Sequence, residues 1–382
     1  MSATSSLPSK MRGLVLEKFA KSPEEEKTPY TYREDLPLPK LEPYQILLKS
    51  MTAGYCHTEM MVVRGEFDKM MQKDLPLVPS HEPTGKVVQW GSEVEAMIQR
   101  GEAKGLGPNG SLKVGDRLAS LTSNNPCGKC DECKSDRSIF CSEIAFCGVT
   151  TDGAMADFVA VDIRSCIQLP DNLSFDTAAP LMCAGATIYA AIKRCNLSSG
   201  QSVAIVGAGA LGHLGVQFAK CLGYKTVLID SRDPPLEMCR TLKYPPDVTF
   251  NSSKVDVKDA SSMAGAVKQC GGEVDAVIVT TDAIPAFQFG LELTKKHGLF
   301  MVVGQPQDPI PVPFFPLIFR DITIKGSFLS DASLTKEMCD LVAEKGVECR
   351  TKAYDLKDVH KLMSDYALPG HSGKLVVHVN KE

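Results

Sequence analysis

Apolar residues along this chain follow two periods, and the change from one to the other divides the sequence into two parts. Up to about residue 170 they come in short runs bounded by Gly, Pro or Asp, a pattern typical of β-strands joined by turns. From Phe175 onward they recur at helical spacing and alternate with compact apolar runs. The sequence therefore predicts a β-rich unit followed by an alternation of helices and strands.

In the first part, the apolar runs predict strands at residues 11–18, 44–51, 85–89, 117–120 and 157–161. The segment between the first two strands is rich in Pro and Glu, and we expect it to form turns. Residues 93–115 contain Gly and Lys, and we expect them to be an exposed insertion. Short strands with regular turns are typical of an antiparallel, barrel-like domain.

The second part predicts a doubly wound parallel sheet. Helical segments separate its strand candidates, which are residues 203–206, 226–229, 276–279, 299–303 and 322–324. The tail, residues 334–380, indicates a helix, a loop and a final strand at 374–379, which we expect to rejoin the first domain. A chain of 382 residues is long enough for two domains, so we expect a two-domain α/β protein.

Three glycines mark the start of the second part as a dinucleotide-binding unit. Gly207, Gly209 and Gly212 form G-x-G-x-x-G directly after a strand and before a helix. The first permits a tight turn, the second lets the backbone approach a pyrophosphate, and the third lets the helix pack closely. Free N–H groups at the start of that helix favour a bound anion.

Asp230 indicates which dinucleotide binds. It ends the second strand, 18 residues after Gly212. A carboxylate there accepts hydrogen bonds from the ribose hydroxyls of adenosine and repels a 2′-phosphate. We therefore expect NAD(H) rather than NADP(H), with Arg232 as the nearby residue that favours the phosphate.

Composition narrows the class of protein. The net charge of −4 gives no reason to expect a nucleic acid or an anionic membrane as a partner. No apolar run approaches the ~20 residues that span a bilayer, and the N-terminal segment lacks a secretory apolar region. We expect a cytoplasmic protein, whose 14 cysteines serve as thiols and metal ligands rather than disulfides.

Four of these cysteines are spaced for one metal ion. Two residues separate Cys127 from Cys130 and Cys130 from Cys133, and seven residues lie between Cys133 and Cys141. Four thiolates leave no open coordination position, which favours a structural zinc site. The loop is polar and has little core of its own, so we expect the metal to supply its folding energy. Free thiols on a surface loop are the alternative.

A second metal site would have to be assembled from distant segments. Cys56 follows a strand, His81 lies in V-P-S-H-E-P-T-G, and Cys183 precedes the nucleotide-binding unit. Each residue alone has an ordinary explanation as a packed thiol or a buried imidazole. Together they form a Cys–His–Cys set, which holds a catalytic zinc with one position left for water or a substrate oxygen.

With these motifs in this order, the chain resembles the zinc-dependent alcohol dehydrogenases of the medium-chain dehydrogenase/reductase family. The resemblance runs from Met11 to Val379 and rests on G-Y-C-H-T, H-E-P-T-G, the four-cysteine loop, G-D-R, L-P-D-N-L-S-F, C-A-G-A-T-I-Y and V-G-A-G-A-L-G. It implies a GroES-like catalytic domain of residues 1–185, completed by 326–382, and a Rossmann domain of residues 186–325. It also implies two zinc ions per chain, the catalytic one on Cys56, His81 and Cys183, and a homodimer or homotetramer.

The resemblance suggests further roles near the reacting groups. Thr58 is the candidate for the hydroxyl that takes the proton of an alcohol, with a turn cap as the structural alternative. His57 matches a position that approaches the cofactor pyrophosphate. Thr187 matches a position beside the nicotinamide, or it is an ordinary helix residue.

For four more residues the sequence leaves open both a functional and a structural role. Glu82 lies behind the metal or is a solvated charge. Lys374 reaches the pyrophosphate or is a solvated charge at a strand end. Phe67 and Phe146 line the substrate cleft or pack in the core.

The chain departs from the family pattern at several positions. Met61 stands where many relatives have the His that ends the proton relay, and a thioether cannot carry a proton. Glu59 replaces the usual Asp that orients the zinc-bound His, and Ser80 replaces the usual Gly before His81. The stretch F-L-S-D-A-S-L-T-K-E-M lacks an Arg that many relatives carry near the cofactor.

These residues favour the interconversion of an alcohol and an aldehyde or ketone, with zinc polarising the substrate oxygen and hydride passing to or from the nicotinamide. One alternative is a specialised reductase of a conjugated C=C or an iminium, which needs no relay for an alcohol proton and which Met61 favours. The other is a zinc-binding scaffold without activity, which does not explain why a ligand set and a nucleotide fingerprint occur together.

Overall fold

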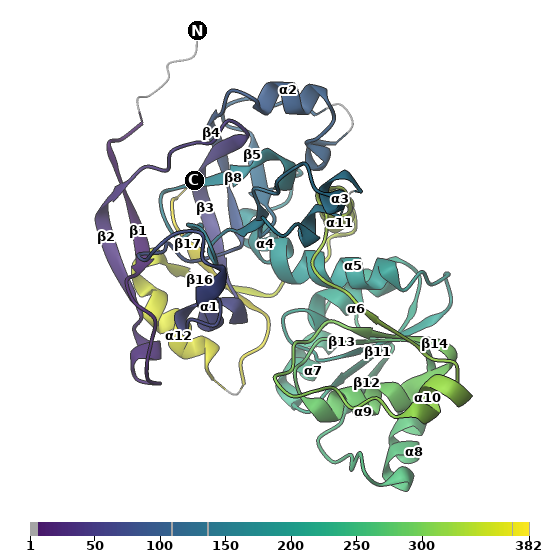
Figure 1. Cartoon of the computed structure of the whole chain (residues 1–382). Helices are drawn as coiled ribbons and strands as arrows, with labels where there is room; N and C mark the ends of the chain where they lie inside the picture. Colours follow the sequence, from purple (N-terminus) through teal and green to yellow (C-terminus); the bar gives the residue numbers. More distant parts are fainter. Residues whose placement is uncertain (1–6, 108–109, 136, 369, 382) are drawn as a thin grey trace.

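The chain forms two sheet-centred bodies side by side, as the computed structural model in Figure 1 shows for residues 7–107, 110–135, 137–368 and 370–381. Strands from both ends of the sequence build the first body, and strands from the middle build the second. Between the bodies run α4 (Phe175–Pro180), a π-helical turn η6 (Leu181–Gly185) and α5 (Ala186–Arg194). The fold is α/β, as the sequence predicts.

The first body is built on a seven-stranded mixed sheet of order β16-β17-β3-β4-β5-β9, with β8 paired to β3. Its strands are β3 (Gln45–Tyr55), β4 (Pro83–Trp90), β5 (Arg117–Ser120), β8 (Phe158–Asp162), β9 (Cys166–Gln168), β16 (Thr351–Asp355) and β17 (Lys374–His378). Two ribbons accompany it, formed by β1 (Lys10–Leu16) with β2 (Tyr30–Pro37) and by β6 (Ser123–Asn124) with β7 (Ala145–Phe146). The tail returns to this body because β17 pairs antiparallel with β3.

The second body is a doubly wound sheet of six parallel strands in the order β12-β11-β10-β13-β14-β15. The strands are β10 (Ser202–Val206), β11 (Lys225–Asp230), β12 (Val248–Asn251), β13 (Val274–Val279), β14 (Thr294–Val302) and β15 (Thr323–Gly326). The order reverses between β10 and β13, and ligands of such folds bind outside the carboxyl ends of the strands at that point.

Helices cover both faces of the parallel sheet. The helices of this body are α6 (Gly212–Cys221), α7 (Asp233–Arg240), α8 (Ala260–Gln269), α9 (Ile284–Leu293) and α10 (Phe314–Phe319). Side chains alternate along β10, so Val203 and Ile205 pack against α5, α6 and α7, while Ala204 and Val206 pack against α8 and α9.

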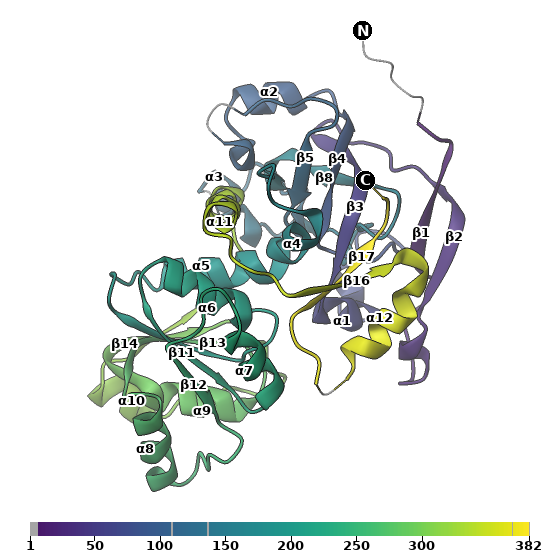
Figure 2. The ribbon, with the colours of Figure 1, turned by 180° about the vertical axis from the view of Figure 1, so that it is seen from behind.

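The remaining helices belong to the first body or to the return segment. They are α1 (His57–Val63), α2 (Val94–Gln99), α3 (Asp131–Lys134), α11 (Ala332–Lys345) and α12 (Val359–Tyr366). Figure 2 shows α12 beside α1, and their apolar side chains share one core cluster with β17. The end of the chain therefore reaches the same region as the segment that follows Cys56.

Several expectations for local structure are wrong. The Pro- and Glu-rich segment contains β2, and β12 and β16 form where no strand was expected. Residues 93–115 are not an exposed insertion: Val94 is fully buried, and Met97 and Leu106 pack with it in a core cluster. Residues 108 and 109 of that segment lie outside the described residues.

One helical run has the length and apolarity of a membrane helix. Phe175–Arg194 has a mean hydropathy of 1.3 over its most apolar window, but 78% of that window is buried inside the protein. The run therefore serves as a core helix between the two bodies.

Candidate active site

A cavity of about 1230 Å³ lies between the two bodies. Residues of the first body that line it include Cys56, His81 and Thr58, and residues of the second include Gly207 and Gly209. The predicted metal donors and the predicted nucleotide loop therefore face the same space.

Three different local structures carry the donors. Cys56 is the N-cap of α1 and follows β3 directly, in an extended conformation. His81 lies on the short segment before β4. Cys183 lies in η6, the π-helical turn that joins α4 to α5, and such turns often occur at functional sites.

These donors converge on one point. One ligand atom each from Cys56, His81, Glu82 and Cys183 lie within 4.8 Å of one another. The His81 ring is almost fully buried, and its Nε2 has no hydrogen-bond partner within the part of the chain that the structure describes. A buried imidazole nitrogen without a partner, facing two thiols, fits a zinc ion.

Glu59 orients His81. Glu59 Oε1 lies 2.6 Å from His81 Nδ1 and 3.1 Å from the backbone nitrogen of His81, and Glu59 Oε2 accepts from the backbone N–H of Cys56 at 2.8 Å. An Nδ1–H that donates to this carboxylate leaves Nε2 available for a metal. The longer side chain at residue 59 thus reaches the imidazole that an Asp orients in relatives.

The two donor thiols share a hydrogen bond that affects both of their pKa values. A hydrogen bond from Cys183 lowers the pKa of the Cys56 thiol well below its usual value, and Lys374 adds to this effect. The same bond, together with burial, raises the pKa of Cys183. A zinc ion at this point would bind both sulfur atoms as thiolates.

Glu82 and Lys374 form a buried ion pair behind the donors. Lys374 Nζ lies 2.6 Å from Glu82 Oε1, and each side chain is at most 2% exposed. Burial raises the pKa of Glu82 to about 7, and Lys374 opposes that shift. Both readings of these residues as solvated charges are wrong, because β17 returns to the sheet beside β3 and encloses them.

Lys374 does not line the cavity that Gly207 and Gly209 line. Its ammonium group also donates to the backbone oxygen of Tyr55 at 3.1 Å. The structure therefore brings Lys374 to the metal donors rather than to the glycine loop. The buried partner that determines this position, Glu82, lies 292 residues away in sequence.

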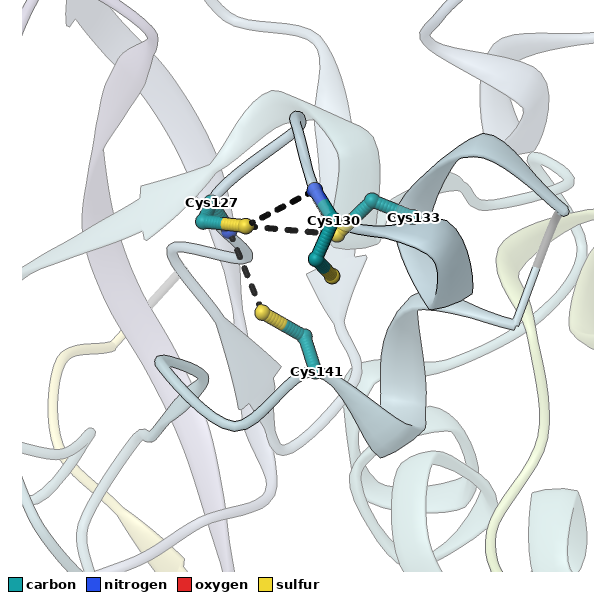
Figure 3. A group of neighbouring side chains, drawn as sticks. All are labelled: Cys127, Cys130, Cys133 and Cys141. Atoms are coloured by element: carbon teal, nitrogen blue, oxygen red, sulfur yellow. Dashed lines mark hydrogen bonds between the residues drawn. The ribbon is translucent and has the colours of Figure 1, made fainter.

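The second cysteine set also comes together. Figure 3 shows the side chains of Cys127, Cys130, Cys133 and Cys141 turned toward a common centre, and their sulfur atoms lie within 4.8 Å of one another. Backbone N–H groups of Lys129 and Cys130 lower the pKa of Cys127 to about 6. The helix in this loop, α3, has no buried residue, so the loop has little apolar core to hold it.

The glycine loop has the conformation that a dinucleotide requires. Gly207 has a φ of +113°, which ordinary residues rarely adopt. A Cβ at Gly209 would meet no atom within 4 Å and would project into the cavity. A Cβ at Gly212 would lie 1.9 Å from the Gly207 carbonyl oxygen, so the start of α6 packs against the turn only with glycine there.

Asp230 lines the cavity next to this loop, and both oxygens of its carboxylate accept hydrogen bonds from the backbone. Its Oδ2 accepts from the backbone N–H of Ala208 at 2.8 Å, and its Oδ1 accepts from the Arg232 backbone at 2.9 Å. Arg232 Nε is 3.1 Å from the same oxygen. Asp230 therefore fixes the loop and also lines the cavity beside it.

Polar and apolar side chains together form the wall near the metal donors. His57, Thr58 and Thr187 line the cavity, as do Met61, Phe67 and Phe146, and Arg64 and Glu66 also belong to the lining. Tyr366 was not predicted: it reaches the cavity from α12 at the end of the chain, with its ring 5.3 Å from that of Tyr55. No short-range pattern marks it, because its place depends on how α12 packs against α1.

Two family models match parts of this chain, and alcohol dehydrogenases are similar to it over most of its length. Residues 42–171 match the alcohol dehydrogenase GroES-like domain, and residues 210–344 match the zinc-binding dehydrogenase family. An alcohol dehydrogenase of Geobacillus stearothermophilus is 30% identical over 97% of this chain and 100% of its own length. Alcohol dehydrogenase 1 of Emericella nidulans is 31% identical over 87% of this chain and 90% of its own.

Solved structures share the fold over its full length. The alcohol dehydrogenase of Aeropyrum pernix is similar with a TM-score of 0.80 and 23% identity, covering 96% of this chain and 99% of its own. The acetophenone reductase of Geotrichum candidum, solved with NAD, has a TM-score of 0.77 and 24% identity over 98% of both chains. This protein belongs to the zinc-binding alcohol dehydrogenases, oxidoreductases that combine a GroES-like domain with a Rossmann-type domain.

Proposed function

We propose that this protein is an NAD(H)-dependent alcohol dehydrogenase or carbonyl reductase with catalytic zinc on Cys56, His81 and Cys183 and structural zinc on the other four cysteines. The observation that supports it best is the shared cavity of the Cys–His–Cys donors and the Gly207–Gly209 turn. When bound, zinc would supply a Lewis acid for the substrate oxygen and NAD(H) would accept or donate hydride.

We assign the other functions of the site, which are orientation of the donors, proton exchange and cofactor binding, to individual side chains. Glu59 holds His81 in one orientation, and the Lys374–Glu82 pair neutralises charge behind the donors. Thr58 lies two residues after Cys56 and lines the cavity, so we assign its hydroxyl to proton exchange with the substrate. Met61 cannot pass that proton on. We assign His57 and the start of α6 to the pyrophosphate, and Thr187 to the nicotinamide end.

The wall near the donors favours a bulky apolar substrate. Met61, Phe67 and Phe146 line it together with Val149 and Tyr366, and thioether and aromatic groups bind apolar bodies by contact rather than by hydrogen bonds. Names of two similar structures, an acetophenone reductase and a cinnamyl alcohol dehydrogenase, refer to aromatic substrates. We therefore expect aryl ketones, aryl aldehydes and their alcohols to be better substrates than ethanol.

Replacement of a donor tests the proposal. Cys183→Ala and His81→Ala should lose turnover, lower the zinc content from two ions to one per chain, and retain NADH binding in calorimetry, because the donors are separate from the glycine loop. Undiminished turnover in either variant would refute the catalytic metal site.

A specific residue supports a second candidate, reduction of a conjugated C=C or an iminium. Met61 replaces the relay His, and such a reaction does not need a relay for an alcohol proton. An enone substrate separates the two functions: reduction of its carbonyl supports the first, and saturation of its C=C supports the second.

We further propose a homodimer formed through the second body. β15 is at the edge of the parallel sheet, and α10 beside it exposes Phe314 by 67%, Ile318 by 68% and Phe319 by 61%. An unpaired strand edge next to exposed apolar side chains can pair with its own copy about a twofold axis. Ile318→Asp should give a monomer in sedimentation velocity, while Val114→Asp, at a site 63% exposed elsewhere, should not.

We also propose the limits of the two domains and a cytoplasmic location for the protein. We place the catalytic domain at residues 1–185 and 326–382 and the nucleotide domain at 186–325, because β10 to β15 lie within or at the edge of the latter range. All 14 cysteines lie in the described part of the chain and are unpaired, which a reducing cytoplasm favours.

A further inference from the structure

Ser80 has an unusual backbone conformation directly beside a metal donor. Its φ is +82°, in the left-handed region that residues with a side chain rarely adopt, and it is fully buried. It precedes His81, and a glycine would adopt this conformation without strain. A strained residue that persists in a buried position next to a functional group calls for an explanation in its side chain.

The surrounding backbone imposes this conformation on whichever residue stands at position 80. A Cβ at Gly148 would lie 2.3 Å from the Ser80 carbonyl carbon, and a Cβ at Gly153 would lie 2.2 Å from the Ser80 oxygen. The same oxygen accepts from the backbone N–H of Ala154 at 3.0 Å. The segment 148–154 thus holds the Ser80 backbone in place independently of the hydroxyl.

The hydroxyl connects the two donor-bearing segments. Ser80 Oγ donates to the backbone oxygen of Gly54 at 2.8 Å, in a buried bond. Gly54 lies on β3, two residues before Cys56, and Ser80 is adjacent to His81. The backbone N–H of Glu82 approaches the same Oγ at 3.4 Å. The hydroxyl therefore links the strand of the first donor to the turn of the second, in addition to the Glu59 carboxylate and the backbone bond from Gly54 N–H to the Glu82 oxygen at 3.2 Å.

We propose that Ser80 is a positioning residue whose hydroxyl fixes the separation of Cys56 and His81 and so slows the release of the catalytic metal. The proposal rests on the metal site proposed above. A glycine at position 80 would relieve the backbone strain but would lack the hydroxyl that donates to the Gly54 oxygen. Serine therefore keeps the strained conformation and gains a bond that holds the two donors in place. Groups that orient metal ligands typically change metal affinity by about 10- to 100-fold.

The chain offers a matched control. Thr84 Oγ1 on β4 donates to the backbone oxygen of Thr52 on β3 at 2.6 Å, so it forms the same kind of buried bond from a hydroxyl to the backbone of β3. Thr84 and Thr52 lie further along their strands from Cys56 and His81. Thr84→Val should therefore affect stability without affecting the donors.

The experiment uses the full-length, zinc-loaded protein and measures zinc transfer to a chromogenic chelator, together with the d–d spectrum after cobalt replaces zinc. We expect Ser80→Ala and Ser80→Gly each to release the zinc of the Cys56–His81–Cys183 site about tenfold faster than the wild type and to shift the cobalt bands. Thr84→Val should stay within about twofold of the wild-type rate, since its bond does not reach a donor.

Comparison of the two Ser80 variants separates positioning from folding. Ser80→Gly relieves the backbone strain and should melt at a higher temperature than Ser80→Ala, although both lack the hydroxyl. If the rate of metal release in the two variants depended only on their melting temperatures, the proposal would be refuted. Release rates and cobalt spectra identical to those of the wild type in both variants would also refute it. A wild-type protein that binds only one zinc per chain would instead refute the catalytic metal site itself.

Discussion

His213 is buried at the start of α6, and its environment keeps the imidazole neutral. Its Nδ1 lies 3.1 Å from the Gly209 oxygen, and its Nε2 has no partner among the described residues. Burial lowers the pKa of His213 to about 4, with Lys374 and Arg350 acting in the same direction. In the unfolded chain a histidine titrates near ~6.5.

Stability should therefore fall as the pH falls from about 6.5 to about 4, because the unfolded chain binds the His213 proton first. This group alone contributes up to ~1.4 kcal/mol per pH unit in that window. Urea unfolding at several pH values measures it, and His213→Gln should reduce the slope. Parallel curves for the wild type and the variant would contradict a depressed His213 pKa.

The effect of Arg232 on the choice between NADH and NADPH can be measured with a single substitution. Arg232 contacts Asp230 and lines the cavity beside the glycine loop, where the proposed cofactor site would hold the adenosine ribose and a 2′-phosphate would meet its charge. We expect Arg232→Ala to weaken NADPH binding by about tenfold, the value of one charged hydrogen bond, and NADH binding by much less. Calorimetry with both cofactors decides this, and an equal loss for both would show that Arg232 acts only through Asp230.

Short-range patterns predicted some site residues and could not predict others. The glycines of the 207–212 turn and the spacing of the four-cysteine loop depend on neighbours in sequence, so they could be found directly. Cys56, His81 and Cys183 required the family resemblance, because three chain segments bring them together. The ion pair of Lys374 with Glu82 was not predicted, since Glu82 becomes a neighbour only when β17 pairs beside β3.

The four-cysteine loop is an element that we expect a metal to stabilise. α3 has no buried residue, and Ile139 and Cys141 are the buried side chains that follow it in the described part of the loop. Cys130→Ser should lower the zinc content by one ion per chain and make residues 126–141 sensitive to protease. NADH binding should change little, because the glycine loop belongs to the other body.

Mass spectrometry of the native protein and limited proteolysis measure these two effects. Cys147→Ser provides the control, since Cys147 is buried near the loop but outside the donor group. Full zinc content in Cys130→Ser would show that the loop does not need its fourth thiolate.

At the level of elements, the sequence predicted the parallel sheet better than the β-rich body. The strands of the second body are continuous apolar runs, because both faces are covered by helices. β2 was missed because its Pro- and Glu-containing sequence resembles a turn, yet it pairs with β1 over most of its length. α2 was missed because its buried face depends on the distant Val161 and Cys166.

Across the whole molecule, one buried side chain ties the return segment to the second body. Gln217 on α6 donates to the Glu348 oxygen at 2.8 Å and accepts from the Glu348 nitrogen at 3.0 Å. Residues 346–350 lead from α11 to β16, so this amide joins the two bodies.

Gln217→Ala leaves the backbone groups of Glu348 without partners and should destabilise the protein by about 2 kcal/mol or more. Denaturant unfolding measures the loss, and Gln269→Ala on the exposed face of α8 is the control with an expected change below ~0.5 kcal/mol. A similar small effect for both variants would show that water or another group replaces the amide.

Phe140 belongs to the loop of the four cysteines and stands next to Cys141, and its ring lies 5.9 Å from that of Phe328, which lines the cavity. Both rings are partly open to solvent, and they contact each other. If the four-cysteine loop folds around a metal, as we propose, that loop also contacts a wall of the chamber in which the other metal would act. Zinc supply would then influence which substrates fit, as well as whether any are turned over.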